Sequence, residues 1–121
     1  MTTHILVADD SASMRAMLSF TLKNAGYDVT VAVDGSEAIQ LAPRCRPALM
    51  ITDLNMPQVD GIQLIRSMRA NPDFCHIPIL MLTTESQENR KREGKDAGAT
   101  GWLVKPFRPE QLLTIIKRVL G

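Results

Sequence analysis

The chain has 121 residues, of which 45% are hydrophobic and 22% charged, with a formal net charge of +1 at pH 7. A single domain of this size buries about two-thirds of its unfolded surface and needs no disulfide or metal to form a core. The composition excludes a disordered chain and a coiled coil, and the balanced charge gives no indication of a nucleic-acid or membrane-surface protein. The longest run without a polar residue, Ile77–Leu82, is too short to span a bilayer.

Two further features concern the cellular compartment. The N-terminal residues have neither the basic start nor the apolar stretch of a signal peptide. Cys45 and Cys75 are in loop-like segments without Cys-x-x-Cys spacing, which indicates reduced thiols. We therefore expect a cytoplasmic protein.

Short apolar segments alternate with helical patterns along the chain. Three of these segments are near-continuous apolar runs, which are typical of strands buried on both faces of a parallel sheet. The predicted strands are Ile5–Ala8, Val29–Ala32, Ala48–Thr52, Ile79–Thr83 and Trp102–Val104.

Five helices are expected between and after these strands, and four of them have an apolar stripe. The fourth is almost wholly polar and has Gly94 in its middle, where glycine costs about 1 kcal/mol relative to alanine. We expect this helix to be weakly packed and a Gly94→Ala substitution to stiffen it. The predicted helices are Ser13–Ala25, Ser36–Ala42, Gly61–Ala70, Ser86–Asp96 and Pro109–Leu120.

This alternation predicts a three-layer α/β domain with a doubly wound, five-stranded parallel sheet flanked by five helices. Functional sites in such folds form at the carboxyl ends of the strands. The residues at or just after four strand ends share polar chemistry suited to binding a cation or an anion. They are Asp9 and Asp10, Asp53, Thr83 and Thr84, and Lys105.

Carboxylates gathered at one edge of a sheet repel one another and raise one another's pKa values unless they share a cation. Oxygen ligands from two or three aspartates suit Mg²⁺, although a single aspartate such as Asp10 is more often a helix cap. A metal-bound carboxylate can also accept a phosphoryl group, whose charge Mg²⁺, Lys105 and the Thr83 hydroxyl would neutralise. The set therefore predicts a phosphoacceptor site with Mg²⁺ as its cofactor.

Other sites fit the sequence less well. The turn after the first strand is acidic and lacks the glycines of a dinucleotide site or the phosphate loop of a flavin site. A dehalogenase-type phosphatase would have an acid where this chain has Asn55, and Cys75 and His76 have no partners at zinc-ligand spacing. The basic runs Arg44–Arg46 and Arg90–Arg92 are expected to be solvated faces.

Five segments, in this order, resemble the receiver domain of response regulators. The resemblance covers essentially the whole of residues 1–121 and is nearest, in length and motif, to the stand-alone chemotaxis regulators of CheY type. The segments are Asp9-Asp10, Asp53-Leu-Asn-Met-Pro57, Asp60-Gly61, Thr83-Thr-Glu85 and Gly101-Trp-Leu-Val-Lys-Pro-Phe107.

The resemblance implies a flavodoxin-like sheet with strand order 2-1-3-4-5. It implies that Asp53 accepts the phosphoryl group from the phosphohistidine of a sensor kinase. It also implies that Asp10, Asp53 and the backbone carbonyl of Asn55 bind Mg²⁺, with Asp9 assisting through water.

Further roles follow from the same resemblance. Thr83 and Lys105 would contact the phosphoryl group, and a cis peptide bond would follow Lys105. Thr83 and Trp102 would form the switch, and we expect the indole to lie only half-buried against charged side chains of the fourth helix. Asn55 and Glu85 would modulate the decay of the phosphoaspartate.

These implications describe a phosphorylation-controlled switch, not an enzyme with a separate substrate. We expect a monomer that binds a sensor histidine kinase and an unknown output protein, the latter on the face of the fourth helix, fifth strand and fifth helix. No output module is expected, because the last helix ends just before Gly121. Chemotaxis, pilus motility and a phosphorelay shuttle stay open. The alternatives are a receiver-fold adaptor that does not use phosphorylation and a receiver excised from a larger regulator.

Overall fold

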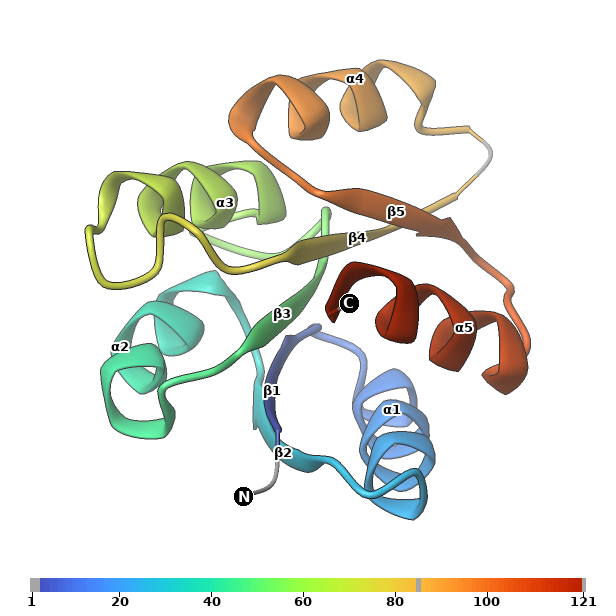
Figure 1. Cartoon of the computed structure of the whole chain (residues 1–121). Helices are drawn as coiled ribbons and strands as arrows, with labels where there is room; N and C mark the ends of the chain where they lie inside the picture. The colour runs from blue at the N-terminus through green and yellow to red at the C-terminus, as the bar shows by residue number, and fades with distance from the viewer. Residues whose placement is uncertain (1–2, 85, 121) are drawn as a thin grey trace.

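A parallel sheet in the order β2-β1-β3-β4-β5 lies between two layers of helices in the computed structural model, which describes residues 3–84 and 86–120 (Figure 1). This order confirms the predicted doubly wound, flavodoxin-like fold. The strands are β1 (His4–Ala8), β2 (Asp28–Ala32), β3 (Leu49–Asp53), β4 (Ile79–Thr83) and β5 (Gly101–Val104). The helices are α1 (Ala12–Asn24), α2 (Gly35–Cys45), α3 (Gly61–Ala70), α4 (Glu88–Ala97) and α5 (Pro109–Leu120).

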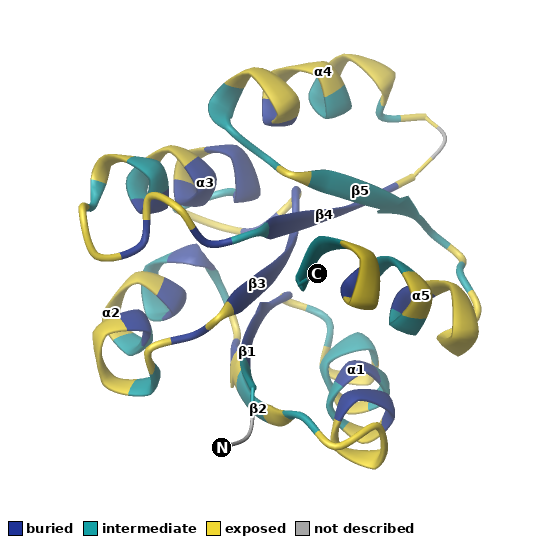
Figure 2. Cartoon of the chain, in the orientation of Figure 1, coloured by how far each residue is buried: buried dark blue, intermediate teal, exposed yellow. Residues whose placement is uncertain are grey.

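The core consists of two clusters, one on each face of the sheet. Side chains alternate along β1, so that Leu6 packs with α2 and α3 on one face and Ile5 packs with α1 and α5 on the other. Strands β3 and β4 are buried at every residue, whereas β5 is only half-buried (Figure 2). None of the helices in the described ranges has the length and apolar character needed to cross a bilayer.

Most element bounds lie within two residues of the predicted ones, but α2 is longer. It continues past Ala42 and through Pro43 to Cys45. Proline removes only one backbone hydrogen bond this close to a helix end, and the Arg46 N–H still donates to the Ala42 carbonyl at 2.9 Å.

The start of α1 determines what Asp10 can do. Ser11 is the N-cap residue, and its hydroxyl oxygen accepts a hydrogen bond from the Met14 N–H at 3.3 Å. Asp10 is therefore not the helix cap. Its exposed carboxylate stays available for other partners.

Helix α4 packs more closely than its composition suggests. Gly94 is its only buried residue and lies directly against Met81 of β4. A β-carbon at position 94 would overlap the Met81 sulfur and lie 3.0 Å from its Cε. Glycine lets α4 approach the sheet, and an alanine here would force the Met81 side chain to shift. The expected stiffening by Gly94→Ala therefore stays a prediction, and this contact opposes it.

Trp102 of β5 lies beneath α4. The ammonium groups of Lys91 and Lys95 are 4.9 and 4.8 Å from the centre of its ring, and the residue is half-buried. Both distances are within the range of a cation–π contact. The predicted half-buried indole against charged side chains is confirmed.

Candidate functional site

Three aspartates meet at the carboxyl edge of the sheet. Asp9 follows β1 and is fully buried, Asp53 is the last residue of β3 and is 9% exposed, and Asp10 is exposed. One carboxylate oxygen from each lies within 4.8 Å of the others. The sheet order brings them together, because β1 and β3 are neighbours and run parallel.

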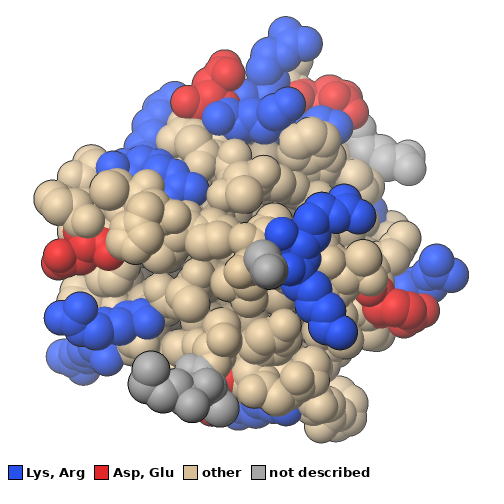
Figure 3. All heavy atoms as spheres, viewed as in Figure 1, with Lys and Arg blue, Asp and Glu red and all other residues tan. Residues whose placement is uncertain are grey.

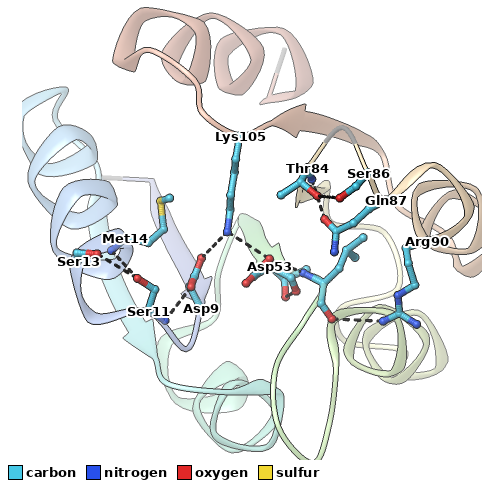
Figure 4. A network of polar contacts seen from close by, with 12 residues as sticks. Asp9, Ser11, Ser13, Met14, Asp53, Thr84, Ser86, Gln87, Arg90 and Lys105 are labelled. Carbon is cyan, nitrogen blue, oxygen red and sulfur yellow. Dashed lines mark hydrogen bonds and ion pairs between the residues drawn. The ribbon is translucent and has the colours of Figure 1, made fainter.

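Lys105, which follows β5, reaches back across the sheet to two of these acids. Its Nζ is 3.3 Å from Asp53 Oδ1 and 3.5 Å from Asp9 Oδ2 (Figure 4). Its backbone N–H donates to the Thr83 carbonyl at 2.6 Å, and the peptide bond to Pro106 is cis, as the family resemblance implies. One ammonium group thus offsets part of the repulsion between two buried carboxylates.

The pKa of Asp53 is raised. Burial is the largest cause, the charge of Lys105 opposes it, and the neighbouring Asp9 raises the pKa further. The Leu54 N–H also donates to Asp53 Oδ1, at 2.9 Å. Since Lys105 and Leu54 both engage Oδ1, the other oxygen, Oδ2, is the one available to an incoming cation or phosphorus atom.

Asp9 is held rigidly at the base of the site. The Ser11 N–H donates to its Oδ1 at 2.9 Å, and the Arg15 guanidinium donates to its backbone carbonyl at 2.8 Å. Its Oδ2 is buried and accepts no hydrogen bond from the described residues. The Lys105 ammonium, at 3.5 Å, is its ion-pair partner. An all-oxygen donor set with a buried carboxylate oxygen that accepts no hydrogen bond fits Mg²⁺, which favours oxygen ligands and retains water.

Thr83 places a second unsatisfied group at the same edge. It is the last residue of β4 and is 1% exposed, and its hydroxyl has no hydrogen-bond partner within the described ranges. A buried hydroxyl without a partner is costly unless a ligand or a rearrangement satisfies it. Thr83 is therefore suited to donate to an anion bound beside Asp53.

The loop of residues 54–60 connects β3 to α3 and forms the rim of the site. It returns so tightly that a β-carbon at Gly61 would overlap the Asp53 carbonyl and lie 2.8 Å from Leu54 Cα. Asn55 is exposed. An open cleft of about 720 Å³ lies along this rim, lined by Asp10, Asn55, Met56, Pro57, Asp60 and Arg90.

Arg90 is the rim residue that sequence reasoning missed. The expected solvated face is wrong at this position, because Arg90 forms an ion pair of 3.0 Å with Asp60 Oδ2. Position 90 lies in the first turn of α4, beside the carboxyl edge of β4, and that placement is the signal that could have identified it. Glu85, predicted to modulate decay, lies outside the described residues.

The family model of the response regulator receiver domain matches residues 5–117 of this chain. Among curated proteins, the chain is 39% identical over 116 residues to the Synechocystis DNA-binding dual master transcriptional regulator RpaA, covering 96% of this chain and 48% of that protein. It is 37% identical over 120 residues to the Bacillus subtilis alkaline phosphatase synthesis transcriptional regulatory protein PhoP, covering 99% and 49%. The chain thus spans about half the length of these curated relatives.

Solved structures of similar length also match. The Vibrio cholerae chemotaxis protein CheY4 is 47% identical with a TM-score of 0.93, over 98% of this chain and 99% of that one. The receiver domain of the Pseudomonas aeruginosa sensor histidine kinase PA1611 is 29% identical with a TM-score of 0.92, over 100% and 99%. That structure has a magnesium ion coordinated in its active-site cleft.

Proposed function

The chain belongs to the response regulator receiver family, and from this premise we propose that Asp53 accepts a phosphoryl group from the phosphohistidine of a sensor histidine kinase. Receiver domains are phosphoacceptor signalling switches and not enzymes with a separate substrate. The observation that most supports Asp53 is its position: a buried carboxylate at a strand end, beside two further acids and 3.3 Å from Lys105.

The same geometry supports a division of roles. Asp53 Oδ2 would form a bond to phosphorus while the phosphorus–nitrogen bond breaks and the histidine nitrogen leaves with its electron pair. Lys105 would pair with a phosphoryl oxygen in place of the carboxylate, and the Thr83 hydroxyl would donate to another. Both groups already lie at the carboxyl edge of the sheet, where Asp53 ends β3.

The residues that would hold Mg²⁺ are Asp10, Asp53 and the backbone carbonyl of Asn55, with Asp9 acting through water. The ion supplies positive charge that keeps the carboxylates ionised and offsets the charge of the phosphoryl oxygens. The magnesium ion in the PA1611 receiver domain supports this proposal. Asn55, at the exposed mouth of the cleft, and Glu85 would admit water for hydrolysis, which gives the phosphoaspartate a lifetime of seconds to a few minutes.

The output would be protein binding on the face of α4, β5 and α5, in the cytoplasm and by a monomer. Lys and Arg side chains gather over α4 on this face, with acidic side chains beside them (Figure 3). Similarity to CheY4 over nearly its whole length favours a role in chemotaxis or motility. The second candidate is transcriptional control within a longer protein, which the two transcriptional relatives favour.

The central test is phosphorylation with acetyl phosphate and Mg²⁺, followed by intact mass. One phosphoryl group should be added to the wild type and none to Asp53→Asn; labelling of the variant at the wild-type rate would refute the assignment. Capture of partners with the beryllofluoride-treated protein, compared with Asp53→Asn, would then identify the output.

A further inference from the structure

Arg90 joins α4 to the loop behind the phosphoacceptor. Its Nη2 donates to Asp60 Oδ2 at 3.0 Å and to the Leu54 carbonyl at 3.4 Å. Figure 4 shows the side chain pointing from α4 toward the backbone that follows Asp53. The Arg90 and Asp60 side chains are only 32% and 29% exposed, so solvent screens this pair less than it screens a fully exposed pair.

The two acceptors lie at opposite ends of the 54–60 loop. The Leu54 carbonyl also accepts the Gly61 N–H at 3.0 Å, which closes the loop. Asp60 uses Oδ1 to cap α3 by accepting the Gln63 N–H at 2.9 Å, which leaves Oδ2 for Arg90. Burial alone would raise the pKa of Asp60, but the bonds from Gln63 and Arg90 outweigh it and lower that pKa. Arg90 therefore binds a carboxylate that stays ionised at neutral pH.

Leu54 connects this contact to the phosphoacceptor itself. Its N–H donates to Asp53 Oδ1 at 2.9 Å, and its carbonyl accepts from Arg90. The residue that follows, Asn55, has the backbone carbonyl assigned above to Mg²⁺. A backbone movement at Asn55 therefore occurs one residue from the Leu54 carbonyl that the Arg90 guanidinium contacts.

The rest of α4 has few polar attachments to the site. Gln87 does not cap α4, and its Oε1 instead accepts the Thr84 N–H at 2.7 Å, at the end of β4 and not at the 54–60 loop. Lys91 pairs with Glu88 within the same turn. Arg92 is exposed and forms no hydrogen bond or ion pair with any residue of the described ranges. Of the α4 side chains in that part of the chain, only Arg90 forms a hydrogen bond with the 54–60 loop.

We propose that Arg90 is a positioning residue: it fixes the 54–60 loop for metal binding and transmits movement of that loop to the first turn of α4. The proposal rests on the proposed function, since it assumes that Asp53 and Asn55 bind the ligands. The contact of Arg90 with the 54–60 loop reaches α4 on the side that faces α3. It is separate from the Thr83 and Trp102 positions, which lie on β4 and β5.

The test compares Arg90→Gln and Asp60→Asn, alone and combined, with Arg92→Gln as a control that removes the same charge from the same helix. Asparagine retains the cap of α3, because its side-chain oxygen also accepts from Gln63. Mg²⁺ affinity is measured by calorimetry. Amide exchange of residues 54–60 and 88–91 is measured with and without Mg²⁺ and beryllofluoride, and thermal unfolding verifies the fold of each variant.

In the wild type and Arg92→Gln, both segments should exchange more slowly on ligand addition. In Arg90→Gln and Asp60→Asn, Mg²⁺ should bind about two- to fivefold more weakly, in line with one partly exposed ion pair. In these two variants, ligand addition should still slow amide exchange in the 54–60 loop but not in residues 88–91. The double variant should be no weaker than either single variant, because the two side chains act as one unit.

The proposal is overturned if ligand addition slows amide exchange of residues 88–91 in Arg90→Gln as much as in the wild type, and the Mg²⁺ affinity is unchanged. Additive effects in the double variant would also contradict it. Failure of wild-type Asp53 to take a phosphoryl group would instead refute the proposed function, and the Mg²⁺ affinities would still test the positioning role of Arg90.

Discussion

Gly94 of α4 rests on Met81 of β4 with no room between them for a β-carbon. We predict that Gly94→Ala destabilises the protein although alanine favours helices. Overpacking a buried contact costs roughly 1–3 kcal/mol, whereas the gain in helix propensity is about 1 kcal/mol. Urea denaturation measures the change. Glu93→Ala, at an exposed position of the same helix, is the control and should leave stability nearly unchanged; a more stable Gly94→Ala protein would show that the contact gives way freely.

A second prediction concerns Asp53 and pH. Its folded pKa is raised above the ordinary value of 3.8, so the folded protein retains this proton to higher pH than the unfolded chain does. The free energy of unfolding therefore falls as pH rises from about that value through the folded pKa. An asparagine side chain resembles the protonated acid, so Asp53→Asn should be more stable than the wild type at neutral pH.

Urea unfolding of both proteins at neutral pH and below pH 3.8 tests this prediction, because the difference should disappear in acid. Mg²⁺ should stabilise the wild type and not Asp53→Asn. Asp73→Asn, which changes an exposed aspartate, should show neither effect. The interpretation fails if Asp53→Asn is the less stable protein at neutral pH.

Lys105 should affect metal binding and phosphoryl transfer in opposite directions. Its ammonium group occupies the site as a competing cation, so Lys105→Met should bind Mg²⁺ more tightly. Transfer from acetyl phosphate should slow by about 100-fold, because one preorganised charge is lost. Calorimetry and intact mass measure the two effects. Lys117→Met, at an exposed position of α5, removes the same charge and should change neither; weaker Mg²⁺ binding in Lys105→Met would argue against the competition.

Trp102 is the only tryptophan, so its fluorescence reports on the contact between β5 and α4. We predict that Mg²⁺ with beryllofluoride shifts its emission to shorter wavelength and reduces acrylamide quenching, as Thr83 moves toward the ligand and the indole turns inward. Burial of the exposed part of the ring is worth a few kcal/mol at most, which is enough to shift two states of similar energy. Thr83→Ala should abolish the shift. Unchanged fluorescence with Asp53 fully occupied would place the switch elsewhere.

The sheet and the acidic edge were predictable from sequence because they depend on local patterns. Continuous apolar runs identify buried strands, and the polar residues that follow such runs, such as Asp9 and Asp53, must meet where parallel strands end. The place of Arg90 at the start of a helix that follows a strand end was visible in the sequence, but its ion pair was not, because its partner Asp60 is 30 positions away and is reached only through a long side chain. The expectation for Gly94→Ala rested on helix propensity, which is a local quantity and could not include the contact with Met81 on another element.

The strands of the sheet also differ in how strongly burial restricts which residues they can carry. Strand β3 ends in Asp53 and is buried at every residue, whereas β5, beneath α4, is fully buried at none. Substitutions in the central strands therefore disturb the core and the acidic edge together. Leu103 of β5 still packs against the core cluster beneath α1 and α5, but substitutions on the outer side of α4 and beside the Trp102 ring meet solvent or flexible lysine side chains. Binding specificity on that face can consequently diverge among related proteins, or be redesigned, while the phosphoacceptor chemistry stays the same.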